Sequence, residues 1–253
     1  MSPDSPLLHA AGITVTFGGI RALDEVDLVV ERGTIAGLIG PNGAGKTTLF
    51  NAITGVVEPR SGRVTLDGTD ITGWPTHRRG RAGVSRTFQR LELFSGLTVY
   101  DNLLSAWEAV TPRAVFGAHR REGRRIVDEL VELLGLEALA PRLAGQLSTG
   151  QGRLVELARA LATRPRVMLL DEPSSGLDPA ETAQFRDVLL RVVGRETGEP
   201  AILLVEHDVA LVMEICDRIT VLDFGVCIAT GTPAEVRADE RVIAAYLGES
   251  DAA

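Results

Sequence analysis

The feature that most constrains this chain is a glycine-rich segment between two apolar stretches. Residues 40–48 read GPNGAGKTT and match the pattern G-x-x-x-x-G-K-[S/T] throughout. The apolar run 34–39 predicts a strand before the segment, and residues 45–54 predict a helix after it. Glycines let successive backbone N–H groups point at one phosphate, and the N-terminus of the helix adds positive potential. The segment therefore predicts a phosphate-binding loop.

Two side chains of this loop carry its chemistry. Lys46 is suited to place its ammonium group on the β- and γ-phosphates of a nucleotide, and the Thr47 hydroxyl is suited to bind Mg²⁺. Lys46 is also the only lysine among 26 cationic residues, which fits a tight backbone nest that a wide guanidinium would not enter. The candidate nucleotide-binding residues here are Gly40, Pro41, Asn42, Gly43, Ala44, Gly45, Lys46, Thr47 and Thr48.

A phosphate loop alone does not name the reaction, because GTPases, small-molecule kinases and ATPases all use one. The guanine-reading motif N-K-x-D needs a second lysine, which this chain does not have. The GTPase class is therefore disfavoured.

Two acids follow a second apolar run, in which residues 167–173 read VMLLDEP. We expect Asp171, at the end of the strand, to hold Mg²⁺ through water. Glu172 is placed to orient or deprotonate an attacking water molecule. A solvated acidic turn is the plainer interpretation, and the phosphate loop makes the functional one preferable.

Strand and helix patterns alternate along the chain, which predicts an α/β core whose parallel sheet is covered on both faces. Asp67-Gly68 adds a hairpin signal. We predict a core formed by residues 1–91 and 163–253, with a helical subdomain inserted at 92–162. The predicted strands are 13–17, 26–30, 34–39, 64–66, 167–170, 201–205, 219–222 and 226–229. The predicted helices after the first are 99–110, 126–134, 153–162, 179–193 and 209–216.

Further short segments complete a recognisable series. In chain order it comprises Phe17, GPNGAGKTT at 40–48, TFQ at 87–89, LSTGQ at 147–151, VMLLDEP at 167–173, SSGLD at 174–178 and EHD at 206–208. In this series the chain resembles ATP-binding cassette (ABC) ATPases over nearly its whole length. The resemblance implies a phosphate-loop ATPase core with a parallel sheet, an antiparallel β subdomain and an inserted α-helical subdomain. It also implies ATP and Mg²⁺ as the bound species.

The resemblance gives roles to three residues that would be unremarkable alone. Phe17 would stack on adenine, although it could be a core residue. Gln89 would contact Mg²⁺ and the attacking water, although it could be a surface amide. His207 would contact the γ-phosphate, although it could be an ordinary histidine at a strand end. The implied catalytic set is Glu172, His207 and Gln89, and the implied metal set is Thr47, Gln89 and Asp171.

Other implied roles require a second subunit. Ser148 and Gly150 would bind the γ-phosphate of ATP held by a second copy, and Gln151 beside them is a further candidate nucleotide-binding residue. Asp178 would lie at the seam between the two copies. Thr149 departs from the family pattern, which usually has glycine there, or tyrosine in some importers, and its β-branched side chain could crowd the phosphate.

Residues 90–103 and the C-terminal half resemble the ATPases of branched-chain amino acid importers, in particular the longer of the two ATPase subunits. This implies a homo- or heterodimer that docks on separate permease subunits at the cytoplasmic face of the plasma (inner) membrane, partly through residues 89–100. Importers of urea or amides and the lipopolysaccharide exporter are alternatives. A non-transport ABC ATPase of DNA repair or the ribosome is a different class, and a small-molecule kinase is a third.

Composition limits these alternatives. The net charge of −8 argues against nucleic acid as a partner, since such binding neutralises phosphates with basic residues. No apolar run is long enough to span a bilayer, and two cysteines predict neither a disulfide framework nor a metal site. Two arginine-rich stretches, 78–90 and 113–125, are best explained as solvated faces, with attraction to anionic lipid as the alternative.

Overall fold

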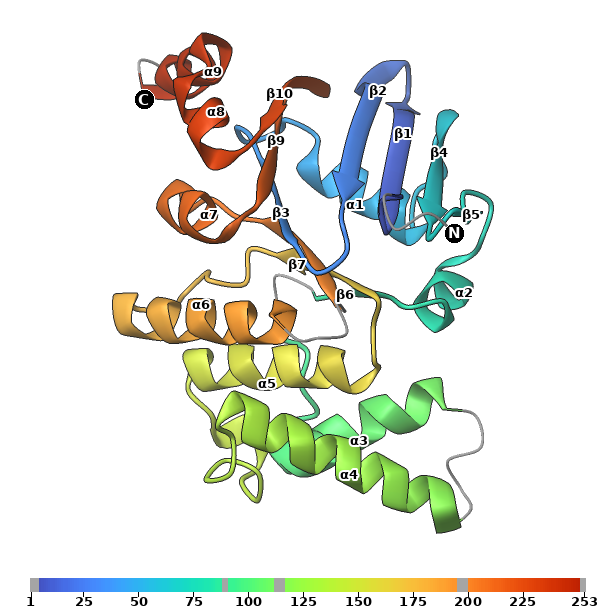
Figure 1. Cartoon of the computed structure of the whole chain (residues 1–253), viewed down its shortest axis with the longest axis vertical. Helices are drawn as coiled ribbons and strands as arrows, with labels where there is room; N and C mark the ends of the chain where they lie inside the picture. The colour runs from blue at the N-terminus through green and yellow to red at the C-terminus, as the bar shows by residue number, and fades with distance from the viewer. Residues whose placement is uncertain (1–4, 88–90, 112–116, 195–199, 251–253) are drawn as a thin grey trace.

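The computed structural model describes residues 5–87, 91–111, 117–194 and 200–250 (Figure 1). The strands are β1 (Leu8–Phe17), β2 (Ile20–Val30), β3 (Ile35–Ile39), β4 (Ser61–Leu66), β5 (Thr69–Asp70), β6 (Val84–Arg86), β7 (Val167–Asp171), β8 (Ala201–Val205), β9 (Arg218–Asp223) and β10 (Val226–Gly231). The helices are α1 (Lys46–Thr54), α2 (Thr76–Arg81), α3 (Val99–Val110), α4 (Gly117–Leu134), the short 3₁₀ helix η1 (Ala144–Gln146), α5 (Thr149–Ala162), α6 (Pro179–Val193), α7 (Val209–Ile215), α8 (Pro233–Ala238) and α9 (Glu240–Ser250).

The central sheet has the strand order β10-β9-β3-β8-β7-β6, and its strands from β9 to β6 are parallel. This confirms the predicted parallel sheet. At one edge β10 runs antiparallel to β9, because the short turn at 224–225 can only return the chain beside the strand that it leaves. The carboxyl ends of β3 and β7 lead into the phosphate loop and the acid pair, so both lie at the same edge of the sheet.

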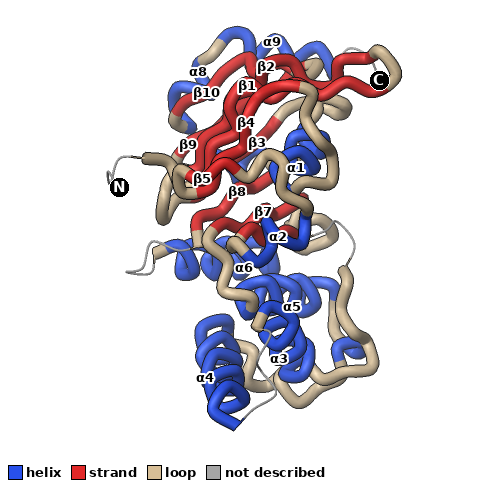
Figure 2. Tube along the Cα trace, turned by 90° about the vertical axis from the view of Figure 1, so that its right-hand side faces the viewer, coloured by secondary structure: helices blue, strands red, loops and turns tan. Residues whose placement is uncertain are grey.

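A second sheet, with the order β2-β1-β4-β5, is antiparallel throughout. The predicted hairpin is confirmed, with Leu66 paired to Thr69 across Asp67-Gly68. Both turn residues have positive φ, at 51° and 72°, as a type I′ turn requires. The expected antiparallel β subdomain is therefore confirmed. In Figures 1 and 2 this sheet lies at the opposite end of the molecule from α3 and α4.

Alternation along the buried strands divides the core between the two faces of the central sheet. On β3, Ala36 and Leu38 join a core with α1 and the antiparallel sheet, whereas Ile35 and Ile39 join a core with the helices of the other face. The second core continues without a break into α3, α4 and α5. The predicted boundaries of the helical subdomain at 92 and 162 therefore stay a prediction.

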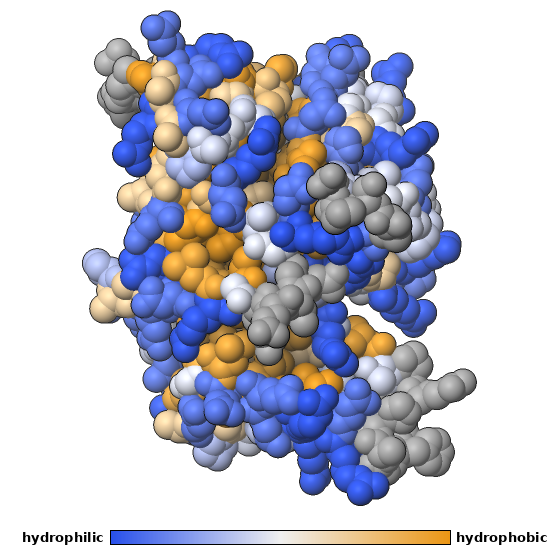
Figure 3. All heavy atoms as spheres, viewed as in Figure 1, coloured by the Kyte–Doolittle hydropathy of each residue, from blue (hydrophilic) through white to orange (hydrophobic). Residues whose placement is uncertain are grey.

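The six predicted helices are present, and two of them begin earlier than predicted, whereas α2, α8, α9 and η1 were not predicted. α5 begins at Thr149 because Ser148 caps it, and α4 begins at Gly117. No helix in the described ranges is both long enough and apolar enough to cross a membrane. Figure 3 shows apolar residues reaching the surface beside α6, where a cavity of about 390 Å³ is lined in part by Leu177, Ala183 and Leu211.

The solvated interpretation of the first arginine-rich stretch is wrong for two of its members. Arg79 is 1% exposed, and its guanidinium donates hydrogen bonds to the carbonyls of Ala52, Ile53, Thr72 and Trp74. Arg86 is also largely buried, in an ion pair with Asp171. A guanidinium group can be buried where protein hydrogen-bond acceptors replace the water molecules that it loses, and both arginines have such acceptors.

Candidate nucleotide site

The phosphate loop has the shape that the sequence predicts. The Lys46 ammonium donates to the carbonyl oxygens of Gly40 at 2.5 Å and Pro41 at 2.9 Å, so it lies inside the loop and not in solvent. The N-cap residue of α1, which begins at Lys46, is Gly45 and has no side chain to cap the helix. The positive end of this helix is therefore available to an anion.

Two glycines of the loop are required by space as well as by conformation. Gly40 has φ of 150°, and a Cβ there would collide with the carbonyl oxygen of Leu222. Gly45 has φ of 103°, and a Cβ would lie 2.9 Å from the Ala22 carbonyl oxygen. Gly43, with φ of 81°, has open space where a Cβ would be. The loop is thus pressed against its neighbours on one side and open on the other, as a cradle for phosphate needs.

The residues at this edge suit a magnesium nucleotide. Thr47 is exposed on the first turn of α1, and the carboxylate of Asp171 stands at the end of β7. Within the described residues there is no group of three or more His, Cys, Asp and Glu side chains that would hold a metal alone. A hydroxyl and one carboxylate fit a cation that keeps waters and takes its remaining ligands from phosphate oxygens.

Asp171 is held by an arginine that sequence reasoning placed elsewhere. Arg86 Nη2 lies 2.8 Å from Asp171 Oδ2, and Arg86 Nη1 donates to Asn51 Oδ1 at 2.6 Å. The side chains of Arg86 and Asp171 are 10% and 5% exposed. A buried carboxylate requires such a partner, because desolvation disfavours its charge.

Glu172 and His207 are brought together by the pairing of β7 with β8. His207 Nε2 lies 2.6 Å from Glu172 Oε1, and the Glu172 N–H donates to the Val205 carbonyl at 2.8 Å. Glu172 has φ of 50°, which is uncommon for a residue with a side chain and marks backbone strain. The sequence predicts both residues at the site but does not predict their direct contact.

Glu206 is a neighbouring residue that the sequence analysis missed. It is 4% exposed, and its carboxylate accepts hydrogen bonds from the backbone N–H groups of Ser174 at 2.8 Å and His207 at 3.2 Å. Burial raises the pKa of Glu206, and the hydrogen bonds from Ser174 oppose that rise. Glu206 therefore ties the loop after β7 to the loop after β8. The sequence signal that could have identified Glu206 is its position directly before His207, at the end of an apolar run.

The remaining residues expected in the same subunit are placed as follows. Phe17 ends β1 with 51% of its surface exposed, so it is not a core residue, and its ring is accessible for stacking. Gln89, expected at the metal and the attacking water, lies outside the described residues.

The LSTGQ segment forms the beginning of α5. Ser148 Oγ accepts the Gln151 N–H, and Gln151 Oε1 accepts the Ser148 N–H, so the two side chains form a capping box. A Cβ at Gly150 would collide with the Glu181 carboxylate of α6, so a larger residue there requires the Glu181 side chain to move. Thr149 is exposed, and its methyl group faces the backbone of Gly176. The neighbours of this segment come from α6, and Asp178 caps that helix.

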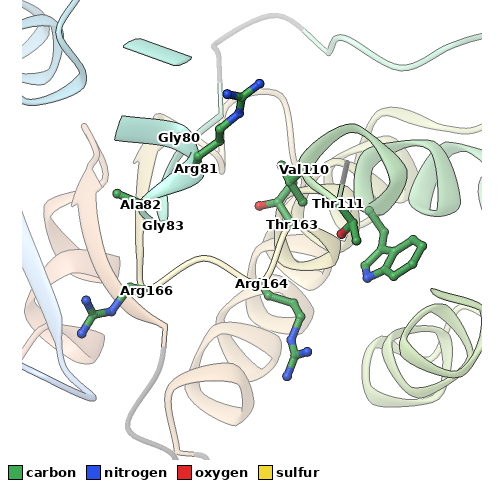
Figure 4. A pocket seen from close by; sticks show the side chains of 10 residues that line it. Gly80, Arg81, Ala82, Gly83, Val110, Thr111, Thr163, Arg164 and Arg166 are labelled. Carbon is green, nitrogen blue, oxygen red and sulfur yellow. The ribbon is translucent and has the colours of Figure 1, made fainter. Parts of the chain in front are cut away.

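A separate cavity of about 290 Å³ lies at the amino ends of β6 and β7, the opposite edge of the sheet (Figure 4). Its lining includes Arg81, Arg164 and Arg166. Figure 4 shows these three guanidinium groups pointing away from one another. Arg166 is paired with Asp67 at 2.7 Å. This cavity therefore lacks the convergent cations of an anion site.

A phosphate loop at the end of one parallel strand and an acid pair at the end of another define a phosphate-loop nucleotide-binding protein. The profile of the ABC transporter family matches residues 23–175, and that of the branched-chain amino acid ATP-binding cassette transporter matches residues 226–252. The chain belongs to the ABC transporter family.

Individual relatives agree with this placement. The chain is 41% identical to the high-affinity branched-chain amino acid transport ATP-binding protein BraF of Pseudomonas aeruginosa, over 97% of this chain and 99% of BraF. It is 38% identical to the lipopolysaccharide export system ATP-binding protein LptB of Escherichia coli K12, over 96% of this chain and 97% of LptB.

Solved structures show the same fold. An ATP-binding cassette of an ABC transporter in its ADP conformation is similar with a TM-score of 0.83 and 32% identity, over 96% of this chain and 99% of that one. A dimeric cassette in a post-hydrolysis state with ADP and Pi is similar with a TM-score of 0.75 and 26% identity, over 89% of this chain and 98% of that one.

Proposed function

We propose that this chain hydrolyses ATP to power the import of branched-chain amino acids through separate permease subunits. The observation that carries the proposal is the C-terminal match. Overall identity scarcely separates BraF, at 41%, from LptB, at 38%. Residues 226–252, however, match the profile of branched-chain amino acid cassettes. ATP and Mg²⁺ are the expected bound species, and the expected location is the cytoplasmic face of the plasma (inner) membrane.

The proposed site grips ATP through its own phosphate loop. The ammonium of Lys46 and the N-terminus of α1 stabilise the negative charge of the phosphates, and the exposed ring of Phe17 stacks on adenine. Mg²⁺, held by Thr47, Asp171 and Gln89, supplies charge neutralisation at the phosphates when it is bound.

The proposed chemical step is an in-line attack by water on the γ-phosphorus. Glu172 accepts a hydrogen bond from that water, so that a lone pair of the water oxygen points at the γ-phosphorus. His207, at 2.6 Å from the Glu172 carboxylate, fixes the direction of that carboxylate and reaches toward the γ-phosphate. Glu206 holds the backbone of His207 in turn. The water oxygen bonds to the γ-phosphorus and gives a proton to Glu172, while the bond from the bridging oxygen to the γ-phosphorus breaks, so that ADP leaves and phosphate forms.

The proposed site is completed by a second ATPase subunit. The solved dimeric relative with ADP and Pi supports such pairing. Ser148, Gly150 and Gln151 at the N-terminus of α5 face the γ-phosphate of the partner's nucleotide, and Asp178 lies at the seam. ATP then favours the closed pair, and its cleavage removes that preference. The closing motion is passed to the permeases through the stretch 89–100.

Reconstitution tests this function. The chain is purified from membranes with the permeases that accompany it, placed in vesicles, and assayed for ATP-dependent uptake of labelled leucine, urea and a short amide. Uptake of leucine that is lost in Lys46→Ala supports the proposal. If the vesicles take up no leucine and the complex extracts lipopolysaccharide instead, the exporter function is favoured. Recovery of the chain with ribosomes or DNA and without permeases contradicts a transport function.

A further inference from the structure

Arg86 connects α1 and β7, the elements that carry Thr47 and Asp171, two of the three proposed magnesium ligands. One guanidinium nitrogen lies 2.8 Å from Asp171 Oδ2 on β7, and another donates to Asn51 Oδ1 on α1 at 2.6 Å. Asn51 follows Thr47 by four residues, so both lie on the same face of α1. The distance between Thr47 and Asp171 is therefore set in part by one planar guanidinium group.

Packing restrains the guanidinium group in addition to these two hydrogen bonds. Its side chain is 10% exposed and lies over the ring of Phe50, which is fully buried, at 5.5 Å from the ring centre. Its backbone belongs to β6, where Arg86 is paired with Leu169 of β7. A guanidinium group fixed in this way is preorganised, because it has little conformational freedom left to lose when a ligand binds.

We propose that Arg86 is a positioning residue of the magnesium site, which orients Asp171 and fixes it relative to Thr47. This inference rests on the proposed nucleotide site. Arg86 thus sets how strongly magnesium strengthens nucleotide binding.

A purely structural ion pair between neighbouring strands is the competing explanation. It would require only the contact with Asp171. The second hydrogen bond, to Asn51, reaches across to the helix of the phosphate loop and adds nothing to the pairing of β6 with β7. The two explanations differ in their effect on magnesium, because a structural pair alters stability and leaves magnesium dependence unchanged.

The test measures ADP affinity of the full chain by titration calorimetry, once in EDTA and once in MgCl₂. The ratio of the two affinities is the magnesium gain. The variants are Arg86→Gln, which removes the charge, and Arg86→Lys, which keeps the charge without the fork. Arg166→Gln is the matched control, because Arg166 forms an ion pair of similar length with Asp67 just before the other end of β7. Thermal unfolding is recorded for each protein.

We expect Arg86→Gln to lose most of the magnesium gain while the affinity in EDTA stays within about twofold, since loss of a metal ligand's partner lowers metal affinity by roughly 10- to 100-fold. Arg86→Lys should recover part of the gain, and Arg166→Gln should retain all of it. An unchanged gain in Arg86→Gln overturns the inference, as does an equal loss in EDTA and in MgCl₂.

Two further results complete the test. If Arg86→Gln does not fold, Asn51→Ala decides, since it removes only the helix end of the bridge; the magnesium gain should fall several-fold, and an unchanged gain overturns the inference. A wild-type chain that binds no ADP in either buffer would instead refute the proposed nucleotide site, so the two failures are distinguishable.

Discussion

Replacement of Arg79 by methionine tests whether the buried guanidinium of α2 stabilises the helix that carries the phosphate loop. Arg79 is 1% exposed, and it donates to Ala52 and Ile53 in the last turn of α1 and to Thr72 and Trp74 beyond it. Methionine fills much of the space but leaves these carbonyls without that donor. At about 1 kcal/mol for each of four hydrogen bonds, the free energy of unfolding should fall by about 4 kcal/mol.

The measurement is thermal or urea unfolding at pH 7. For a chain of this size, about 4 kcal/mol corresponds to a fall in Tm of roughly 8–16 °C. Arg78→Met is the matched control on the same helix. The Arg78 guanidinium is exposed and stacks on Trp74 at 3.8 Å, so its loss should cost only about 0.5–1 kcal/mol. Losses for the two variants that agree within about 1 kcal/mol would refute the reasoning.

Further predictions concern the site and the two thiols. Lys46→Ala should weaken ATP binding at least about tenfold in calorimetry, because the phosphates lose a charge-assisted bond, and unchanged affinity would contradict its role. His207→Ala should lower kcat about 100-fold with ATP affinity within about twofold, and an equal loss of both would indicate a binding role instead. Glu206→Gln should lower kcat about tenfold, because an amide cannot accept both backbone N–H groups, and wild-type kcat would contradict the clamp. Burial raises the pKa of Cys216 to about 12, so its reactive thiolate is scarce at pH 8 and iodoacetamide should modify Cys227 first; rapid labelling of Cys216 in the native chain by mass spectrometry would contradict its burial.

Much of the fold could be predicted because its signals are local. The strand, loop and helix around residues 40–48 are encoded in one continuous segment, and the hairpin at Asp67-Gly68 follows from two residues that accept positive φ. Helices α3 and α6 match their patterns end to end because periodicity and capping agree. Predictions were less accurate where a helix is polar, as at the beginning of α4.

The contacts within the site depend on which strands become neighbours, and local patterns do not contain that information. Glu172 and His207 meet because β7 pairs with β8, although they are 35 positions apart in the sequence. The placement of Arg79 and Arg86 shows the same limit. In the sequence both stand in a run of arginines that suggests a solvated face, whereas in the fold each finds buried acceptors from other elements.

The most direct test of the central claim is the oligomeric state of Glu172→Gln with ATP and Mg²⁺, measured by light scattering after size exclusion. Glutamine keeps the shape of the side chain but cannot act as a base, so nucleotide binding should persist while cleavage stops. We predict a stable dimer that retains two ATP molecules and returns to monomer when Ser148→Arg is added. A variant that turns over ATP rapidly, or that binds ATP and stays monomeric, would contradict an ATPase whose sites are shared between two copies.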